Sequence, residues 1–171
     1  MKRSRDFVSV ALCLFGPLLM VTSSYSQDCV PPPSGLVSWW PGDGNANDIQ
    51  DGNDGTFMNA ATTVPGLVGD AFSLDGVDDH VNVSDSPSLR GFNDFSFGGW
   101  FKSNSLATPN TFISKYNDSQ NRHSFSLYHF SSGKVWCSLS DGISSYNYVS
   151  AVSSGVLNTG EWHHAVCTRS G

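Results

Sequence analysis

The segment that most constrains the fold is residues 95–102, Phe-Ser-Phe-Gly-Gly-Trp-Phe-Lys. Successive side chains of a β-strand point to opposite faces, so this segment predicts a strand with one phenylalanine-rich face. That face is formed by Phe95, Phe97, Gly99 and Phe101. The opposite face is formed by Ser96, Gly98, Trp100 and Lys102. A strand that offers three phenylalanines to a core is typical of a central strand in a β-sandwich.

Nine more short runs have the same period of two, and turns rich in Gly, Asp, Asn and Ser separate them. These predicted strands are residues 36–40, 56–59, 71–74, 80–83, 111–115, 124–130, 134–139, 146–151 and 161–168. No stretch of a dozen residues carries an apolar stripe at helical spacing. The sequence therefore predicts an all-β domain.

Residues 124–139 predict a β-hairpin that turns at Ser131-Ser132-Gly133. Alternation identifies its inward side chains as Phe125, Leu127, Val135, Cys137 and Leu139. Many short antiparallel strands joined by such turns fit a jelly roll or a related two-sheet sandwich.

The N-terminus has the layout of a secretory signal, with Lys2, Arg3 and Arg5 before an apolar run at residues 7–21. We expect residues 1–26 to be the signal, with cleavage after Ser26, and residues 27–34 to be a stiff, proline-rich lead-in. The apolar run is shorter than the ~20 residues that cross a bilayer as a helix, so no membrane span is expected. A secreted protein, extracellular or at the cell surface, is the resulting prediction.

The charge balance argues against nucleic acid as a partner. The chain has 15 Asp and Glu residues against 9 Lys and Arg, a formal net charge of −6. An acidic chain with scattered lysines is a poor match for phosphate backbones or anionic membranes.

Three cysteines follow the predicted cleavage site: Cys29, Cys137 and Cys167. An exported protein favours one disulfide among them. The odd count leaves either one free thiol or a partner outside this chain, and the pairing stays open at this point.

Several segments, in this order along the chain, resemble the laminin-G-like jelly-roll domains of the concanavalin A-like lectin/glucanase superfamily. They are GLVSWWPGDGNAND (35–48), DGTFMNA (54–60), AFSLDGVDDHVNV (71–83), FSFGGWFKS (95–103), FISKYN (112–117) and GEWHHAV (160–166). The resemblance implies a two-sheet antiparallel sandwich over residues 35–171, concanavalin A-like, used as an extracellular module that binds carbohydrate, protein or a cell surface. In such domains further strands follow the Trp-His-His-x-Val strand. We therefore expect an incomplete sandwich whose C-terminal strands are missing, within a longer multidomain chain.

Glucanases share this fold, and retaining glycosidases need two carboxyl groups ~5 Å apart. The chain has a single glutamate, Glu161, and its aspartates lie mostly in turns, where they bond local backbone N–H groups. A non-enzymatic recognition or adhesion module is the expectation. The alternatives are an accessory binding domain of a larger secreted enzyme and a ligand-free structural spacer in a surface protein.

Residues 41–54 offer closely spaced Asp and Asn oxygens, the ligands that Ca²⁺ prefers. The calcium-loop template fails at its glycine and its glutamate positions, so a surface loop that caps its own turns is the favoured interpretation. A calcium ion near Asp43 and Asp48 is kept as a hypothesis, and no other cofactor is expected. The acidic turn LDGVDDHV (74–81) is interpreted as structural.

Aromatic side chains could stack on a sugar ring, and Tyr146 and Tyr148 in the polar stretch ISSYNYVS are the candidate ligand-binding residues. For Trp40, Trp100 and Trp136, core packing is the expectation.

The adjacent histidines at 163 and 164 are predicted to lie on a strand. Alternation then puts Trp162, His164 and Val166 on one face and His163, Ala165 and Cys167 on the other. The two imidazoles point in opposite directions and cannot share a metal ion.

Overall fold

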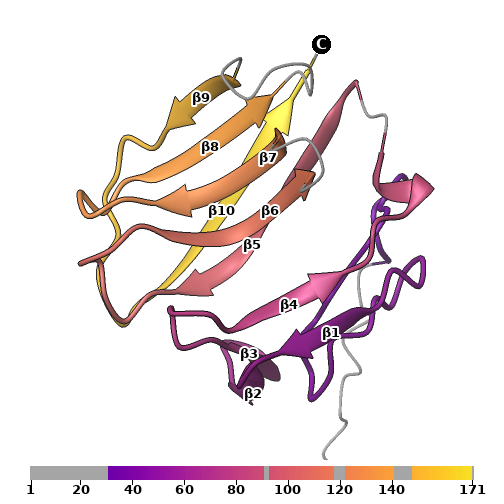
Figure 1. Cartoon of the computed structure of the whole chain (residues 1–171), viewed down its shortest axis with the longest axis horizontal. Coiled ribbons are helices and arrows are strands. Elements are labelled where there is room, and N and C mark those ends of the chain that lie inside the picture. The colour runs from indigo at the N-terminus through magenta and orange to yellow at the C-terminus, as the bar shows by residue number, and fades with distance from the viewer. Residues whose placement is uncertain (1–30, 91–92, 118–121, 141–147, 171) are drawn as a thin grey trace, which may run out of the picture. The chain divides into compact units, whose positions relative to one another are not determined.

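The structure, a computed structural model, describes residues 31–90, 93–117, 122–140 and 148–170. Every described element lies within residues 34–171, which form one compact unit. These elements are ten β-strands, paired antiparallel, and one 3-10 turn at Pro87–Leu89 (Figure 1). In the described part of the chain, no helix has the length and apolar character that a membrane crossing requires. The all-β prediction is confirmed.

Two sheets of unequal width form the sandwich. The larger has the strand order β6–β7–β8–β9, with bounds Asn110–Asn117, Arg122–His129, Val135–Ser140 and Tyr148–Val152. The smaller pairs β5, Phe95–Lys102, with β10, Trp162–Arg169. The β7–β8 hairpin is confirmed, with Leu127 opposite Cys137.

Contacts between the inner faces show how the sheets overlap. Phe97 of β5 lies against Phe125 of β7, with ring centroids 4.4 Å apart. Phe101 of β5 stacks on Phe112 of β6 at 3.8 Å. A disulfide joins Cys167 of β10 to Cys137 of β8. The phenylalanine face of β5 therefore covers β6 and β7, while β10 covers β8.

The core lies between these sheets, as the alternation predicted. Leu127, Cys137 and Cys167 are buried at its centre. Half-buried apolar side chains pack around them: Phe97, Phe112, Ile113, Val135, Leu139 and Ala165. The fold is thus the two-sheet antiparallel sandwich of the concanavalin A-like class.

Four short strands before the sandwich pair as two ribbons. β1, Gly55–Met58, pairs with β4, His80–Val83, and β2, Thr62–Pro65, pairs with β3, Asp70–Ser73. Phe57 of β1 and Phe72 of β3 meet edge to face at 5.9 Å, which joins the two ribbons.

Two expectations about strands were wrong, and one strand was missed. Residues 36–40 form no strand, because the backbone of Trp39 bonds the loop at Asp48 and Ile49 instead of a ladder. β2 was not predicted, because four residues ending in proline show little alternation. β5 is not central in its sheet, since β10 is its one hydrogen-bonded neighbour among the described strands. Alternation reports which face is buried and says nothing about how many strands flank it.

Candidate functional site

The outer face of β5 and β10 carries a group of aromatic side chains, one of which, Trp100, is 58% exposed. Along β5 half-buried and exposed residues alternate strictly, which confirms the predicted faces. The phenylalanines point into the core, so Trp100 points outward and is 58% exposed. In β10 the same alternation leaves His164 and Val166 exposed on the outer face, while Cys167 is buried on the inner face.

Antiparallel pairing brings the rings of this face together in two rows. Trp100 is directly opposite His164, with ring centroids 5.0 Å apart and planes at 44°. Lys102 is directly opposite Trp162, and its ammonium lies 5.2 Å from the centroid of the indole. We call these four residues the aromatic face.

The outward side chains of β5 and β10 also include polar groups. The hydroxyls of Ser96 and Thr168 bond each other at 2.9 Å on the same side of the ribbon. The outward residues of the two strands include no carboxylate; they are Ser96, Gly98, Trp100, Lys102, Trp162, His164, Val166 and Thr168. An indole surface flanked by hydroxyl, imidazole and ammonium groups can stack on a flat apolar surface and offer hydrogen bonds at its rim.

The expected core packing of tryptophans was wrong for Trp100. Trp136 also does not belong to the core cluster: it alternates with the buried Cys137 in β8 and lies half-buried against Phe130, with ring centroids 5.4 Å apart. Trp40 is half-buried, with its indole N–H donating to the carbonyl of Asn53 at 2.8 Å. The expectation for Trp100 follows from the fact that tryptophans are mostly buried. Alternation within its own strand instead places Trp100 on the face that points away from the phenylalanines. That alternation was the signal that identifies it as a surface residue.

The two tyrosines proposed from sequence remain predictions. Tyr146 lies outside the described residues. Tyr148 is the first residue of β9, and its backbone pairs with Ser140. Its side chain lies outside the described part.

Asp48 organises the loop that was weighed as a calcium site. It is 7% exposed, and its carboxylate accepts backbone hydrogen bonds from Trp39 at 2.8 Å, Gln50 at 3.0 Å and Asn53 at 3.1 Å. Burial on its own raises the pKa of Asp48, but these bonds and one from the Ser38 hydroxyl outweigh it and lower the pKa to about 2. The carboxylate is therefore a charged anchor for three segments of backbone.

The other acidic groups of this loop also bond backbone. Asp54 accepts from the N–H of Asp48 at 2.9 Å, and Asp43 accepts from the N–H of Asp70 at 2.8 Å. Among the described residues, neither Asp43 nor Asp48 belongs to a group of three side chains whose ligand atoms are close enough to hold one metal ion. The capping that the sequence favoured is what the structure shows, and the calcium hypothesis stays a prediction.

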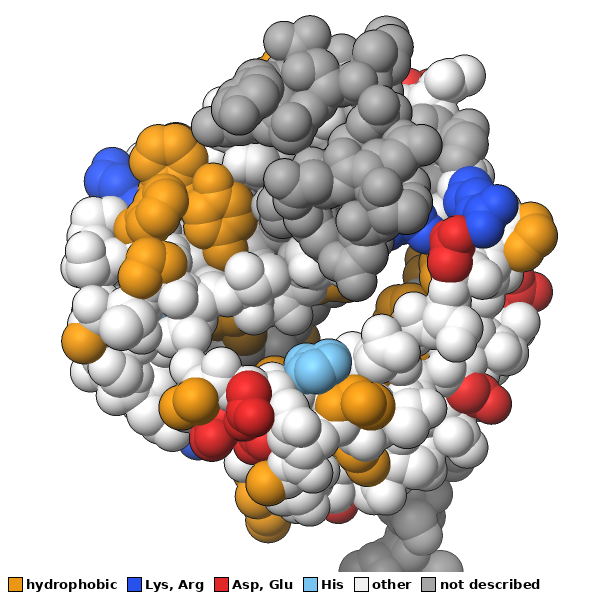
Figure 2. Space-filling model, in the orientation of Figure 1, with side chains coloured by type: hydrophobic (Ala, Val, Ile, Leu, Met, Phe, Trp, Pro, Cys, Tyr) orange, Lys and Arg blue, Asp and Glu red, His pale blue; other side chains and the backbone are white. Residues whose placement is uncertain are grey.

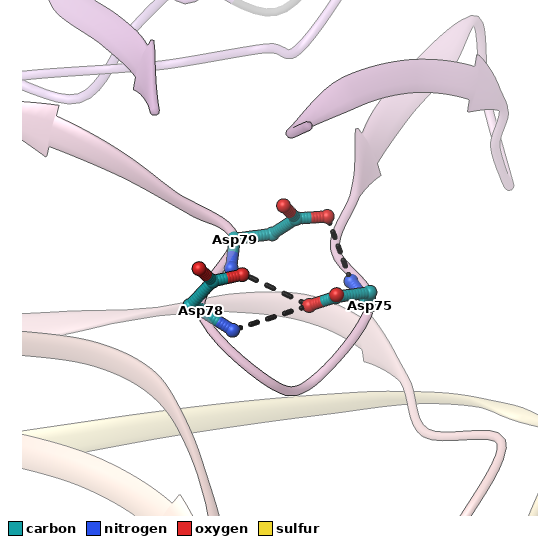
Figure 3. A group of neighbouring side chains, drawn as sticks. All are labelled: Asp75, Asp78 and Asp79. Carbon is teal, nitrogen blue, oxygen red and sulfur yellow. Dashed lines mark hydrogen bonds between the residues drawn. The ribbon is translucent and has the colours of Figure 1, made fainter. Parts of the chain in front are cut away.

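One acidic group does bring three carboxylates together, Asp75, Asp78 and Asp79, whose oxygens lie within 4.8 Å of one another (Figure 3). Three backbone N–H groups donate to Asp75, those of Val77, Asp78 and Asp79, at 2.8, 3.3 and 3.4 Å. The bond from Val77 contributes most to holding the pKa of Asp75 below its ordinary value. With Gly76 at φ +77°, the group closes a tight turn between β3 and β4, as interpreted from sequence.

The cysteines and histidines lie as follows. Cys137 and Cys167 form a disulfide, one of the pairings left open by the sequence, and Cys29 lies outside the described residues. His163 is on the inner side of β10, and its Nε2 lies 3.2 Å from both the backbone N–H and the backbone carbonyl oxygen of Asn158. The tautomer decides whether this nitrogen accepts from the N–H or donates to the carbonyl. His164 is on the outer side against Trp100, so the two imidazoles do not share a site.

Comparison with known proteins agrees with this architecture. A laminin G-like family model, described as "Concanavalin A-like lectin/glucanases superfamily", matches residues 75–171, more than half of the chain. A crystal structure of an S-layer domain-containing protein (residues 221–444) from Clostridium thermocellum has the same fold, with a TM-score of 0.58 and 22% sequence identity. The similarity covers 77% of this chain and 67% of that one. No curated protein matches the chain. The matched segment contains both sheets of the sandwich, and the chain belongs to the laminin G-like family of the concanavalin A-like lectin/glucanases superfamily.

Proposed function

We propose that this protein is an exported, non-catalytic recognition module that binds carbohydrate or an extracellular protein through the aromatic face. The family and the fold fit an extracellular binding or structural module. The observation that carries the proposal is the outward position of Trp100, 58% exposed and paired with His164 across the β5–β10 ribbon.

The arrangement supports binding because it brings together aromatic side chains that do not belong to the hydrophobic core. Single exposed apolar side chains are common on proteins. Here two indoles and an imidazole occupy opposed positions of one ribbon, and the phenylalanines of β5 already supply the core. Tryptophans in such positions frequently dominate the free energy of binding, because they bury a large area with little loss of side-chain entropy.

Carbohydrate is the ligand that best fits the chemistry of this face. The apolar side of a pyranose ring is flat and can stack on the Trp100 indole, while its hydroxyls reach polar groups at the rim. Those groups are the Lys102 ammonium and the His164 imidazole. The Ser96 and Thr168 hydroxyls lie four residues along the strands, ~13 Å away, where they could contact a further ring of an oligosaccharide. A protein partner would use the same indole as an anchor, without the requirement for a ring-shaped ligand.

The proposal assigns no catalytic residue. Glu161, the single glutamate, accepts a hydrogen bond from the side-chain amide of Asn158 at 2.8 Å and is exposed at the turn before β10. Retaining glycoside hydrolysis would need a second carboxyl group ~5 Å from it, and the proposal assigns no residue to that role.

The test is a glycan array with the purified protein, followed by calorimetry of any glycan that binds, and a pull-down from extracellular extracts. Trp100→Ala should weaken binding by about tenfold or more, since a hot-spot tryptophan contributes ~2 kcal/mol. Trp39→Ala is the matched control, because Trp39 is also exposed, at 47%, but lies before β1.

Equal loss of binding in both variants, or no loss in Trp100→Ala, would place the contact elsewhere. An empty array together with an empty pull-down would favour the structural spacer, the alternative raised by the sequence.

A further inference from the structure

Lys102 is a cation of the aromatic face whose neighbour is a ring and not a carboxylate. It is exposed on the outer side of β5, and its ammonium lies 5.2 Å from the centroid of the Trp162 indole across the ribbon. In the described part of the chain, no acidic side chain lies within ion-pair distance of it. The indole attracts the positive charge, but it does not satisfy all three N–H donors of an ammonium. The contact therefore holds the charge in place and leaves donors for a ligand.

Three other basic side chains differ from Lys102 because they have oxygen partners. Figure 2 shows basic and acidic side chains side by side at the right-hand edge of the view. Arg90 and Lys115 both pair with Asp85, Lys115 at 2.6 Å. Lys134 donates to a backbone carbonyl at 3.3 Å. The comparison identifies Lys102 as a cation that an anionic ligand can use without breaking an existing ion pair.

The residues beside Lys102 bring an apolar platform close to this charge. Trp100, which is 58% exposed, lies two residues from Lys102 on the same side of β5, ~7 Å along the strand. The outward residues of β5 and β10 include no carboxylate. Glu161, just before β10, accepts a hydrogen bond from a side-chain amide of the preceding turn at 2.8 Å. A sugar ring stacked on Trp100 would therefore have an ammonium at its edge, with no acidic side chain of these two strands on the same side.

We propose that the aromatic face selects carbohydrates whose rings carry a carboxylate, that is, chains of uronic acids. The apolar side of the ring stacks on Trp100, and the carboxylate of the ring accepts hydrogen bonds from the Lys102 ammonium. Hydrogen bonds between charged partners are roughly twice as strong as those between neutral groups. A uronic acid therefore gains more from Lys102 than the corresponding neutral sugar does. This inference rests on the proposed function, because it names the class of carbohydrate for the same face.

A single carboxylate on each ring matches the charge of this face. Lys102 is the one lysine among the outward residues of β5 and β10, and none of these residues is arginine. A densely sulfated glycan brings several negative charges to each contact, and the net charge of −6 on the chain repels them. At physiological ionic strength charges are screened beyond ~8 Å. A short uronic acid chain therefore keeps its contact with Lys102 and feels little repulsion from distant carboxylates.

The test compares charged and uncharged forms of the same oligosaccharide on the purified full chain. The probes are hexamers of galacturonic acid and of mannuronic acid, each measured by calorimetry beside its methyl ester, at about 0.15 M salt. The ester keeps the sugar ring and removes the negative charge. We expect at least one of the two acids to bind about fivefold more tightly than its ester, the range of an exposed, charge-assisted contact.

Variants assign this difference to one side chain. Lys102→Met keeps the apolar stem and removes the charge, so it should lower the affinity for the acid to that for the ester and leave the affinity for the ester unchanged. Lys102→Arg should retain the preference for the acid. Lys134→Met is the matched control, because it changes the net charge equally on the other sheet and should alter neither affinity. Trp100→Ala should weaken the binding of acid and ester alike.

The outcomes separate this inference from the proposed function. Equal affinity for acid and ester, with both lost in Trp100→Ala, would overturn the carboxylate preference and leave the aromatic face as a carbohydrate site. A preference for the acid that persists in Lys102→Met would also overturn it, as would tighter binding of a densely sulfated hexamer. If none of the uronic acid probes binds, the inference fails, while the glycan array and the pull-down decide the proposed function independently.

Discussion

Cys137 of β8 and Cys167 of β10 are joined by a disulfide that crosses the core from one sheet to the other, with their Cα atoms 6.0 Å apart. Both residues are buried, at 9% and 5% exposure. They lie 30 residues apart in the sequence, so the bond closes a long loop that contains β9 and the turn before β10. It is therefore the covalent tie between sheets that share no backbone ladder.

The first prediction concerns this tie. Replacing both residues, Cys137→Ala with Cys167→Ala, should lower the free energy of unfolding by about 3 kcal/mol, the loss expected for a loop of this length. Urea unfolding followed by fluorescence measures the change. Cys29→Ala is the control, since it leaves this disulfide intact. A double variant as stable as the unmodified protein would mean that the core holds the two sheets together without the bond.

The second prediction uses two neighbouring glycines of β5. A Cβ atom added at Gly98 would clash with the carbonyl oxygen of Ala165 and lie 2.7 Å from the Cα of Val166, both backbone atoms of β10. Gly98→Ala should therefore force β5 and β10 apart and cost about 1–3 kcal/mol. A Cβ at Gly99 would have no atom within 4 Å, so Gly99→Ala should be tolerated. Thermal melts of the two variants, side by side, separate this steric effect from helix or strand propensity.

The third prediction follows from the pKa of Asp48. Its folded value of about 2 is below the ordinary 3.8, so the carboxylate stabilises the fold fully above pH ~4. That stability is lost as the pH falls from about 4 toward 2, because over this range the unfolded state binds a proton at Asp48 and the folded state does not. The shift corresponds to a contribution on the order of 2 kcal/mol at neutral pH.

Asp48→Asn should remove most of this contribution at pH 7 and flatten the dependence of stability on pH between 4 and 2. Denaturant unfolding at a series of pH values measures both effects. Asp51→Asn, an exposed position in the same loop, should change neither. Parallel pH profiles for Asp48→Asn and the unmodified protein would show that other carboxyl groups carry the acid sensitivity.

The fourth prediction concerns calcium. The carboxylates of Asp43 and Asp48 each accept backbone hydrogen bonds, at separate donors. We expect millimolar Ca²⁺ to leave the melting temperature unchanged and to give no heat of binding in calorimetry. A rise in melting temperature that disappears in Asp43→Asn would contradict this expectation and support the calcium site.

Much of the sandwich follows from the sequence because its strands bury one face each. The period of two in residues 95–102 and 161–168 correctly separates core side chains from surface ones, down to the opposite directions of His163 and His164. The same local pattern identifies the β7–β8 hairpin and its inward residues. The turn at Asp75 and Gly76 can also be predicted from sequence, because the Asp75 carboxylate accepts from the nearby N–H of Val77 and Gly76 adopts a positive φ. Both features are local and do not depend on the rest of the fold.

Other features depend on residues that are far apart in the chain. Trp39 was expected in a strand, but Asp48 supplies its hydrogen-bond partner, and no periodicity reports such a contact. The pairing of Trp100 with His164 requires the register of β10 on β5, which sequence alternation leaves open by steps of two residues. The position of one sheet over the other is fixed by the contact between Phe97 and Phe125 and by the Cys137–Cys167 disulfide. This position leaves Val149 of β9 exposed. The sequence thus determined which face of each strand is buried, because that depends on local alternation, and tertiary structure decided which strands meet, because that depends on distant contacts.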